Sequence, residues 1–391
     1  MAEDQLGLDL NSDENFILLN PRWPKEDFEK LQTLAESVQT ERDLSNHVWI
    51  ATSGSTADSI GSTKLVALSK SALQASAISV NKHLQTTQSD VWTQVLPHFH
   101  VGGLGIEIRA QLSGAKVVKA LNHGKWDPKY FYQVLCSEKC TLSALVPTQV
   151  YDLVERQYKS PPDLRAIVVG GGALDLPLFE KARALGWPLL PSYGMTETAS
   201  QIATASLESL NHSDYPAIEL LSHANARTNT EGFLEVTASS LFTCYAQNTA
   251  EGPLHWDPKV GNWFTTEDRG QVDDHQLKIS GRNKDYIKIG GEGTNVARLR
   301  ALLEKTALDL NPQWPLQVTL IDLPSERLGA EIHMATTLPK DIAQKIAESY
   351  SEKVLPFEKI RKIHTLKEIP RSDLGKVLWV HLKNQLQRSD V

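Results

Sequence analysis

The feature that most constrains the fold is an alternation of short apolar runs with helix-forming segments between about residues 48 and 190. Thr141–Val146 and Ala166–Val169 have the length and composition of buried strands. Helix-like segments follow them at 147–158 and 176–185. Because neighbouring parallel strands need a long crossover connection, this alternation predicts an α/β fold with a mostly parallel sheet.

The predicted secondary-structure pattern changes twice after this region. From about residue 214, short strands separated by Gly, Asn and Asp turns predict an antiparallel β region attached to the first sheet. After Asp285, helical and hairpin patterns predict a small α+β domain. We therefore expect a large domain over 1–283 and a small mobile domain over 285–391.

Composition limits the partners. Lys and Arg number 40 against 47 Asp and Glu, a net charge of −7, which argues against nucleic acid as the main partner. Three cysteines imply no disulfide framework and favour a reducing cytoplasm, and we interpret Cys136 and Cys140 as buried thiols. No apolar run approaches the roughly 20 residues that span a bilayer, so we expect no membrane insertion. The sequence does not determine the oligomeric state.

Two hydroxyl-rich segments are candidates for phosphate chemistry. The first is Thr52-Ser53-Gly54-Ser55-Thr56, with Lys64 downstream; it suits phosphate oxygens, and its alternative interpretation is a solvated loop. The second is Pro191-Ser192-Tyr193-Gly194-Met195-Thr196-Glu197-Thr198. Its tyrosine can stack on a base and its carboxylate can bind Mg²⁺, although the same residues also suit a helix start.

Three further segments carry charged residues in turns. Trp263–Gly270 contains Asp268, a carboxylate suited to a pair of ribose hydroxyls, and Gly281–Lys288 follows it. Pro370-Arg371-Ser372-Asp373-Leu374-Gly375-Lys376 presents one lysine ahead of a predicted terminal helix. Each segment taken alone also suits a solvated turn.

The order of these five segments resembles the core motifs of the acyl-adenylate-forming superfamily, over residues 52–376. Three further passages resemble the o-succinylbenzoate–CoA ligases of menaquinone biosynthesis within that superfamily: Leu96–Leu104 followed by Arg109, Leu145-Val146-Pro147-Thr148-Gln149, and Gly290-Gly291-Glu292-Gly293. The resemblance implies an ATP-dependent, AMP-forming ligase that uses Mg²⁺, a small carboxylic acid and CoA.

The resemblance also implies residue roles. Lys376, Thr196 and Glu197 are the expected catalytic residues, with Glu197 also binding Mg²⁺. ATP is expected to contact Thr52, Ser53, Gly54, Ser55, Thr56, Lys64, Gly171, Gly172, Tyr193, Asp268 and Arg282. The acyl substrate and CoA are expected near His100, Arg109, Gly290 and Gly291, and Lys284 is the expected hinge.

Departures from the family pattern leave alternatives open. Residues 57–63 lengthen the phosphate loop, and fewer residues precede that loop than is usual in the family. A degenerate homologue that binds nucleotide, or an adenylation enzyme that loads a carrier protein, would share these motifs. Arg109 has two interpretations, a surface residue paired with a carboxylate such as Glu107, or a guanidinium that holds a second substrate carboxylate.

Overall fold

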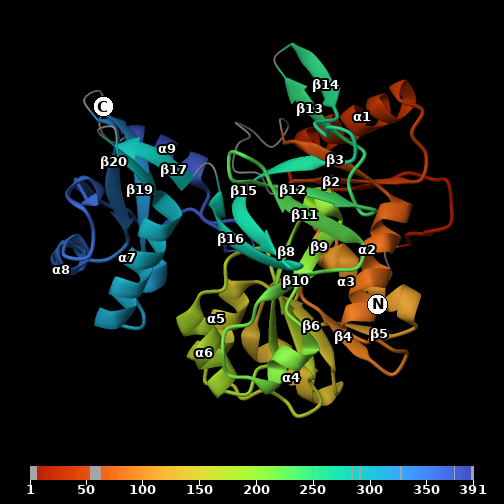
Figure 1. Cartoon of the computed structure of the whole chain (residues 1–391), viewed down its shortest axis with the longest axis horizontal. Coiled ribbons are helices and arrows are strands. Elements are labelled where there is room, and N and C mark those ends of the chain that lie inside the picture. Colours follow the sequence, from red (N-terminus) through yellow and green to blue (C-terminus); the bar gives the residue numbers. More distant parts are fainter. Residues whose placement is uncertain are drawn as a thin grey trace. The chain divides into compact units, whose positions relative to one another are not determined.

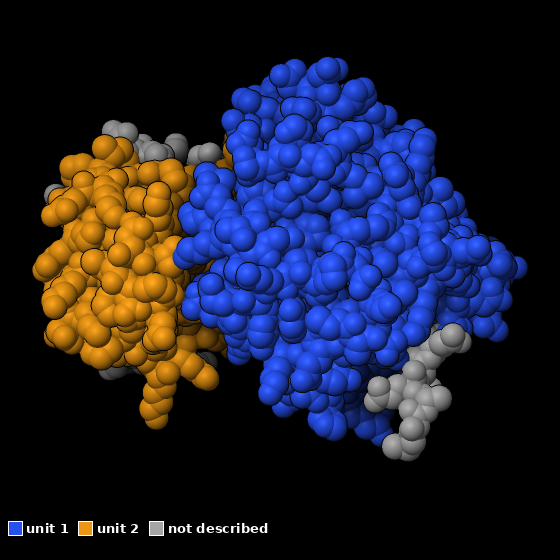
Figure 2. All heavy atoms as spheres, turned by 90° about the horizontal axis from the view of Figure 1, so that it is seen from below, with its two compact units in different colours: residues 1–266, 271–278 blue, residues 267–270, 279–391 orange. Residues whose placement is uncertain are grey.

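The structure is a computed structural model of the chain, and it describes residues 7–52, 63–249, 251–282, 285–289, 292–325, 328–373 and 375–388. The chain divides into two compact units (Figure 2). Unit 1 comprises residues 1–266 and 271–278, and unit 2 comprises 267–270 and 279–391. The predicted boundary at Lys284 lies outside the described residues.

The α/β architecture is confirmed in unit 1. Its parallel strands are β4 (Val91–Gln94), β5 (Lys116–Lys119), β6 (Leu142–Leu145), β7 (Ala166–Val169) and β8 (Leu189–Met195), with neighbours β8-β7-β6-β4-β5. The helices between them are α3 (Val101–Ser113), α4 (Pro128–Ser137), α5 (Pro147–Glu155) and α6 (Leu176–Ala184) (Figure 1). The core cluster around β6, β7, α4 and α5 includes Phe131, Phe179 and Trp187.

The same sheet continues with strands that follow the turn at 196–198. They are β9 (Ser200–Thr204), β10 (Ile218–Leu220), β11 (Ala224–Thr228), β12 (Phe233–Ala238), β15 (Phe264–Asp273) and β16 (Gln276–Arg282). β9 pairs antiparallel with β8, and β10 pairs antiparallel with β9 and β16. The predicted antiparallel region is therefore joined to the parallel sheet through β8 and β9.

A second sheet of unit 1 carries the strands on either side of the predicted phosphate loop. Its order is β1 (Phe16–Leu18), β2 (His47–Ala51), β3 (Leu65–Ser69), β13 (Cys244–Thr249) and β14 (Gly252–Trp256). Helix α1 (Lys25–Glu41) packs on this sheet, and α2 (Lys70–His83) follows β3. The Ser69 side chain accepts a hydrogen bond from the Ala72 amide at 3.1 Å and is therefore the N-cap of α2.

Unit 2 is the α+β region. Its elements are β17 (Tyr286–Ile289), β18 (Glu292–Asn295), α7 (Val296–Leu310), β19 (Val318–Ser325), β20 (Gly329–Thr336), α8 (Lys340–Ser351), β21 (Lys362–Thr365) and α9 (Trp379–Arg388). β19 and β20 form the predicted hairpin, and β21 adds parallel to β20. Leu299 and Leu303 of α7 pack with Ile346 of α8 in its core.

One local expectation is wrong. Cys136 is exposed and only Cys140 of that pair is buried, because Cys136 lies on the outer face of α4 whereas Cys140 lies between that helix and β6. The predicted terminal helix is α9, which begins at Trp379, and Val377 before it pairs with Arg371 in a β-bridge.

Candidate active site

The glycines after β7 leave a bare stretch of backbone at the carboxyl end of the parallel sheet. Gly171 has φ of +75°, a conformation that favours glycine. A side chain at Gly170 would lie 2.9 Å from Ser192 Oγ, which donates to the Val169 carbonyl at 3.0 Å. Gly171 and Gly172 are exposed, and Tyr193 lies on the neighbouring strand β8. A planar ring can approach such a surface closely, at the edge where open α/β sheets bind ligands.

The turn after β8 fixes Thr196 and Glu197 tightly. Residues Thr196–Thr198 form a short 3₁₀ helix, and the Thr198 hydroxyl contacts the carbonyls of Met195 and Ser200 at 3.1 and 2.7 Å. Gly194 must be glycine, since a side chain there would lie 2.0 Å from the Ser200 carbonyl oxygen. The predicted helix start is therefore a constrained turn that presents Thr196 and Glu197 beyond the sheet.

Lys64 lies close to Glu197 although the loop before it is longer than in the family. Thr52 and Lys64 close the ends of that loop, because the Thr52 amide donates to the Lys64 carbonyl at 2.9 Å. Lys64 Nζ lies 3.9 Å from Glu197 Oε1. The fold thus brings together three residues predicted to meet phosphate and Mg²⁺, all within unit 1.

The residues present fit a magnesium ion held partly by substrate. Mg²⁺ is usually bound through one or two carboxylates together with phosphate oxygens of the substrate. The Glu197 side chain is 14% exposed, and it carries a carboxylate, the type of group that such an ion prefers. Among the described residues no group of three or more His, Cys, Asp or Glu side chains forms a closed metal site. Glu197 alone therefore suits a cation shared with a triphosphate.

Arg109 is buried, which excludes its interpretation as a surface residue. The side chain is 1% exposed, and its Nη2 donates to Ser200 Oγ at 3.0 Å and to Gln201 Oε1 at 3.2 Å. Gly105, one turn earlier on α3, makes room for it, since a side chain there would lie 3.1 Å from Arg109 Nη2. The guanidinium reaches the start of β9, where Ser200 pairs with Met195 at the end of β8.

The electrostatic environment of Arg109 is unusual. Within the described residues no carboxylate lies within ion-pair distance of its guanidinium, and its Nε has no hydrogen-bond partner. Burial lowers the pKa of Arg109 to about 10. A buried cation with only neutral partners is costly, so this position is well suited to receive a carboxylate from outside the chain.

His223 belongs to the same environment. Burial, and then the charge of Arg109, lower the pKa of His223 to about 4. Both of its ring nitrogens are buried and have no hydrogen-bond partner among the described residues. The imidazole is neutral at physiological pH and retains one unused donor and one unused acceptor.

Other predicted residues are placed separately. His100 is the N-cap residue of α3, and its ring centroid lies 4.8 Å from that of Phe99. Asp268 is buried on β15, and Arg282 ends β16. Lys376 is exposed on a tight turn in unit 2, where the Ser372 amide donates to the Lys376 carbonyl at 2.7 Å.

Several predicted residues lie outside the described part of the chain. They are the loop residues Ser53, Gly54, Ser55 and Thr56, the hinge residue Lys284, and Gly290 and Gly291. Their assignments stay predictions from the motifs.

Two residues outside all of the sequence motifs contact the candidate site. Tyr245 donates to Glu197 Oε1 at 2.8 Å, and His223 lies near Arg109. Neither belongs to a recognisable local pattern. A strand register pairing 244–246 with 65–67 would have indicated Tyr245, but register is a long-range property.

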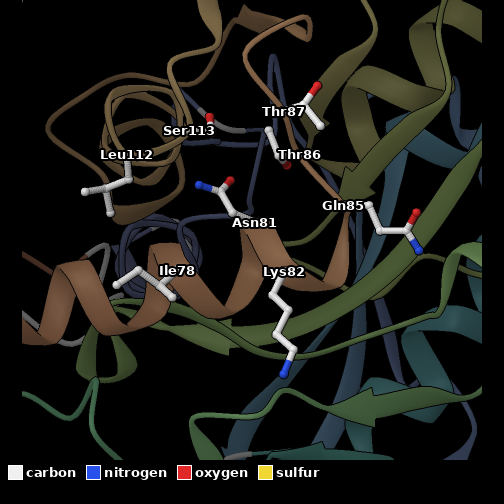
Figure 3. A pocket seen from close by; sticks show the side chains of 8 residues that line it. All are labelled: Ile78, Asn81, Lys82, Gln85, Thr86, Thr87, Leu112 and Ser113. Atoms are coloured by element: carbon white, nitrogen blue, oxygen red, sulfur yellow. The ribbon is translucent and has the colours of Figure 1, made fainter.

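A shallow hollow between α2 and α3 is a separate feature (Figure 3). It has a volume of about 410 Å³ and is lined by Ile78, Asn81, Lys82, Gln85, Thr86, Thr87, Leu112 and Ser113. None of the predicted site residues lines it.

Comparison with known proteins shows the family of the chain. Residues 10–225 match the family described as AMP-binding enzyme, and the chain therefore belongs to that family. It is 27% identical over 361 residues to the 2-succinylbenzoate–CoA ligase of Bacillus cytotoxicus, covering 90% of this chain and 72% of that one. It is 26% identical over 320 residues to the enzyme of the same name from Bacillus subtilis, covering 79% of this chain and 63% of that one.

A solved structure shares the fold. The o-succinylbenzoate CoA synthetase (MenE) of Bacillus subtilis, in complex with the acyl-adenylate intermediate OSB-AMP, superposes with a TM-score of 0.71 and 26% identity. The match covers 86% of this chain and 68% of that one, so the chain spans about two thirds of the length of such relatives. No helix among the described residues is both long and apolar enough to cross a membrane.

Proposed function

We propose that this protein is an AMP-forming carboxylate–CoA ligase and that its acid substrate is o-succinylbenzoate. Its family, its similarity to 2-succinylbenzoate–CoA ligases and the cluster of Lys64 and Glu197 support the ligase activity. One observation favours a dicarboxylic substrate above the others. Arg109 is buried beside the site with no carboxylate partner among the described residues, so a second substrate carboxylate would complete it.

The nucleotide would lie along the carboxyl edge of the sheet. Gly171 and Gly172 would border the adenine and Tyr193 would stack on it, while Asp268 and Arg282 would hold the ribose hydroxyls. The phosphates would lie between the loop that starts at Thr52 and the turn that carries Thr196. Lys64, Glu197 and a bound Mg²⁺ would balance their charge.

The reaction has two steps. In the first, a carboxylate oxygen attacks the α-phosphorus, the bond to the β-phosphate breaks, and pyrophosphate leaves. Lys376 would contact the attacking carboxylate and the α-phosphate, and its charge would stabilise the negative charge that develops. In the second step, the CoA thiolate attacks the acyl carbon and AMP leaves.

We infer that unit 2 reorients between the steps. The lysine that serves the first step would obstruct the pantetheine chain in the second, so the small domain would rotate about Lys284 and bring Gly290 and Gly291 to the CoA path. We also propose that the enzyme is cytoplasmic, where its free cysteines would stay reduced.

The half-reactions test the ligase assignment. Lys376→Ala is expected to lower acyl-AMP formation by more than about 1000-fold. Release of AMP from supplied acyl-AMP and CoA is expected to stay within a few-fold of wild type. Equal losses in both half-reactions would contradict separate roles for Lys376.

Wild-type assays separate the alternatives. Pyrophosphate release is measured with MgATP and either o-succinylbenzoate or an aromatic monocarboxylic analogue, and AMP release is then measured with CoA or a carrier-protein thiol. We expect a preference for the dicarboxylic acid and for CoA. Release only with the carrier protein would indicate a stand-alone adenylation enzyme, and ATP binding without pyrophosphate release would indicate a degenerate homologue.

A further inference from the structure

Three side chains from distant parts of unit 1 form one contact cluster. Lys64 precedes β3, Glu197 lies in the turn after β8, and Tyr245 lies on β13. The Tyr245 hydroxyl donates to Glu197 Oε1 at 2.8 Å, and Lys64 Nζ lies 3.8 Å from the centroid of the Tyr245 ring. Tyr245 thus contacts both the carboxylate and the ammonium, which are themselves 3.9 Å apart.

The backbone around Tyr245 holds this cluster in place. Tyr245 pairs with Val66 in the β13–β3 ladder, two residues from Lys64. Three residues before Tyr245, the Phe242 amide donates to the Glu197 carbonyl at 2.9 Å. The strand that carries the tyrosine therefore bonds directly to the backbone near both of its partners.

The ring of Tyr245 has little freedom. The residue is 4% exposed, and its ring centroid lies 4.5 Å from that of Phe242 and 5.0 Å from that of Trp256. Packing on both neighbours restricts the side chain to one orientation, so the hydroxyl is a fixed donor.

The contacts of Glu197 are asymmetric. The phenol donates to Oε1, which is also the oxygen that Lys64 Nζ approaches at 3.9 Å, and no hydrogen bond from the described residues reaches Oε2. A neutral phenol orients a carboxylate without removing its charge, and the second oxygen keeps its lone pairs for a hard cation.

The geometry points to Tyr245 as a positioning residue of the nucleotide site, one that directs Glu197 Oε2 toward the magnesium of MgATP and holds Lys64 beside the phosphates. This inference rests on the proposed function, because it requires Glu197 to bind the metal. Tyr245 acts through Glu197 and Lys64 and touches no reacting atom.

The alternative is that Tyr245 serves only to fill the core. Phenylalanine would fill the same volume and would keep the contact of the ring with Lys64, so only the hydroxyl distinguishes the two roles. Tyr215→Phe is a matched control in unit 1, because the Tyr215 hydroxyl also donates a hydrogen bond, at 2.9 Å, to the Leu174 carbonyl.

The test measures equilibrium binding of ATP by calorimetry over a series of Mg²⁺ concentrations, and the KM and kcat of pyrophosphate release. Tyr245→Phe is expected to raise the Mg²⁺ concentration at half-maximal binding by about tenfold, the effect of losing one hydrogen bond to a charged group. Tyr215→Phe is expected to leave it unchanged, and both variants are expected to unfold within a few degrees of wild type.

A double variant adds a second criterion. Because Tyr245 acts through Glu197, adding Tyr245→Phe to Glu197→Gln is expected to cause no further rise in the Mg²⁺ concentration at half-maximal ATP binding. A wild-type Mg²⁺ midpoint in Tyr245→Phe, or full additivity with Glu197→Gln, would overturn the inference. If the wild-type protein binds ATP with no dependence on Mg²⁺, the proposed function fails first.

Discussion

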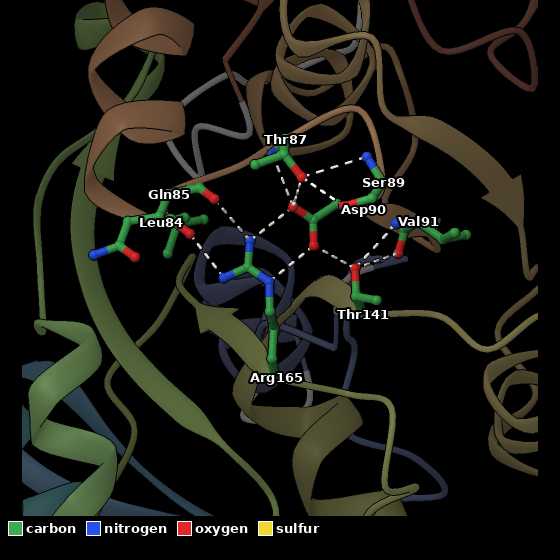
Figure 4. A network of polar contacts seen from close by, with 8 residues as sticks. All are labelled: Leu84, Gln85, Thr87, Ser89, Asp90, Val91, Thr141 and Arg165. Carbon is green, nitrogen blue, oxygen red and sulfur yellow. Dashed lines mark hydrogen bonds and ion pairs between the residues drawn. The ribbon is translucent and has the colours of Figure 1, made fainter.

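Two arginines of unit 1 occupy opposite electrostatic situations. Arg165 precedes β7 at the amino edge of the parallel sheet, and its Nε and Nη2 donate to the two carboxylate oxygens of Asp90 at 2.8 and 2.9 Å (Figure 4). Arg109 reaches the residues beyond the carboxyl end of β8, and it donates hydrogen bonds to the neutral side chains of Ser200 and Gln201.

The residues at the amino edge of the parallel sheet are fully hydrogen-bonded to one another. Asp90, Thr141 and Arg165 immediately precede β4, β6 and β7, and the Thr141 hydroxyl donates to Asp90 Oδ1 at 2.7 Å. Arg165 Nη1 also donates to the Leu84 carbonyl at the end of α2. Despite its burial, the bonds to Arg165, Thr87 and Thr141 lower the pKa of Asp90 to about 2. This network links the starts of three strands, and its hydrogen-bonding groups are already used within the protein.

The contrast between the two arginines separates a structural polar group from a functional one. Both arginines are held by packing, and only the one with a carboxylate has its charge balanced within the described chain. An unbalanced buried charge lowers stability, and it persists where a ligand completes it. We therefore expect substitution by methionine to lower activity at Arg109 and to lower stability at Arg165.

The largest expected effect is on activity, at Arg109. Arg109→Met is expected to lower kcat/KM for o-succinylbenzoate by about 1000-fold, because two charged hydrogen bonds to substrate are lost. The free energy of unfolding is expected to stay within about 1 kcal/mol of wild type, since the substitution removes an uncompensated charge. Kinetics with the dicarboxylic acid and its monocarboxylic analogue, together with urea unfolding, measure both quantities. Equal losses of kcat/KM for the two acids would contradict a role of Arg109 in binding the second carboxylate.

The matching substitution at the amino edge acts on stability. Arg165→Met is expected to lower the free energy of unfolding by about 3 kcal/mol, because it leaves the Asp90 carboxylate buried without its cation. The KM values for ATP and acid are expected to match wild type at a temperature where the variant is folded. A changed KM for the acid at unchanged stability would show that the two edges are not distinct.

The pH dependence of stability sharpens the contrast. His223 is neutral in the folded protein down to a pKa of about 4, whereas an exposed histidine titrates near 6.5. The unfolded chain therefore binds a proton first as the pH falls, and the folded state loses about 2 kcal/mol relative to it by pH 5. His223→Gln is expected to remove this loss in urea unfolding at pH 7 and pH 5.

Asp90 acts in a separate, more acidic window. Its folded pKa of about 2 lies below the usual value, so its contribution is complete above about pH 4 and is lost as the pH falls toward 2. A loss of stability between pH 7 and pH 5 that persists in His223→Gln would show that another group is responsible.

The smallest expected effect concerns Thr141. Thr141→Val removes the hydroxyl that donates to Asp90 and accepts from the Val91 amide at 3.0 Å, while it keeps the shape of the side chain. We expect a loss of about 1 kcal/mol in the free energy of unfolding, with unchanged kinetics. A loss as large as that of Arg165→Met would mean that the hydroxyl, rather than the ion pair, dominates the network.

The local elements and the order of the motifs follow from the chain alone. The apolar run 166–169 and the helical segments near 147–158 and 176–185 each depend on neighbours a few residues away, and the structure contains all three, as β7, α5 and α6. Local propensity and capping act over one or two turns, so they can be read directly from the chain.

Which polar groups are buried, and which groups they contact, depends instead on the tertiary packing. Glu107 suggested a surface partner for Arg109, yet α3 is enclosed on nearly every side, with Gly103, Leu104, Ile106, Ile108 and Ala110 all buried. A helix without a polar face gives no periodic signal that would place a single arginine. The contact of Tyr245 with Glu197 spans 48 residues, and that of Arg165 with Asp90 spans 75. Such pairs depend on strand order and register, which are set by the packing of the whole unit rather than by any segment of its sequence.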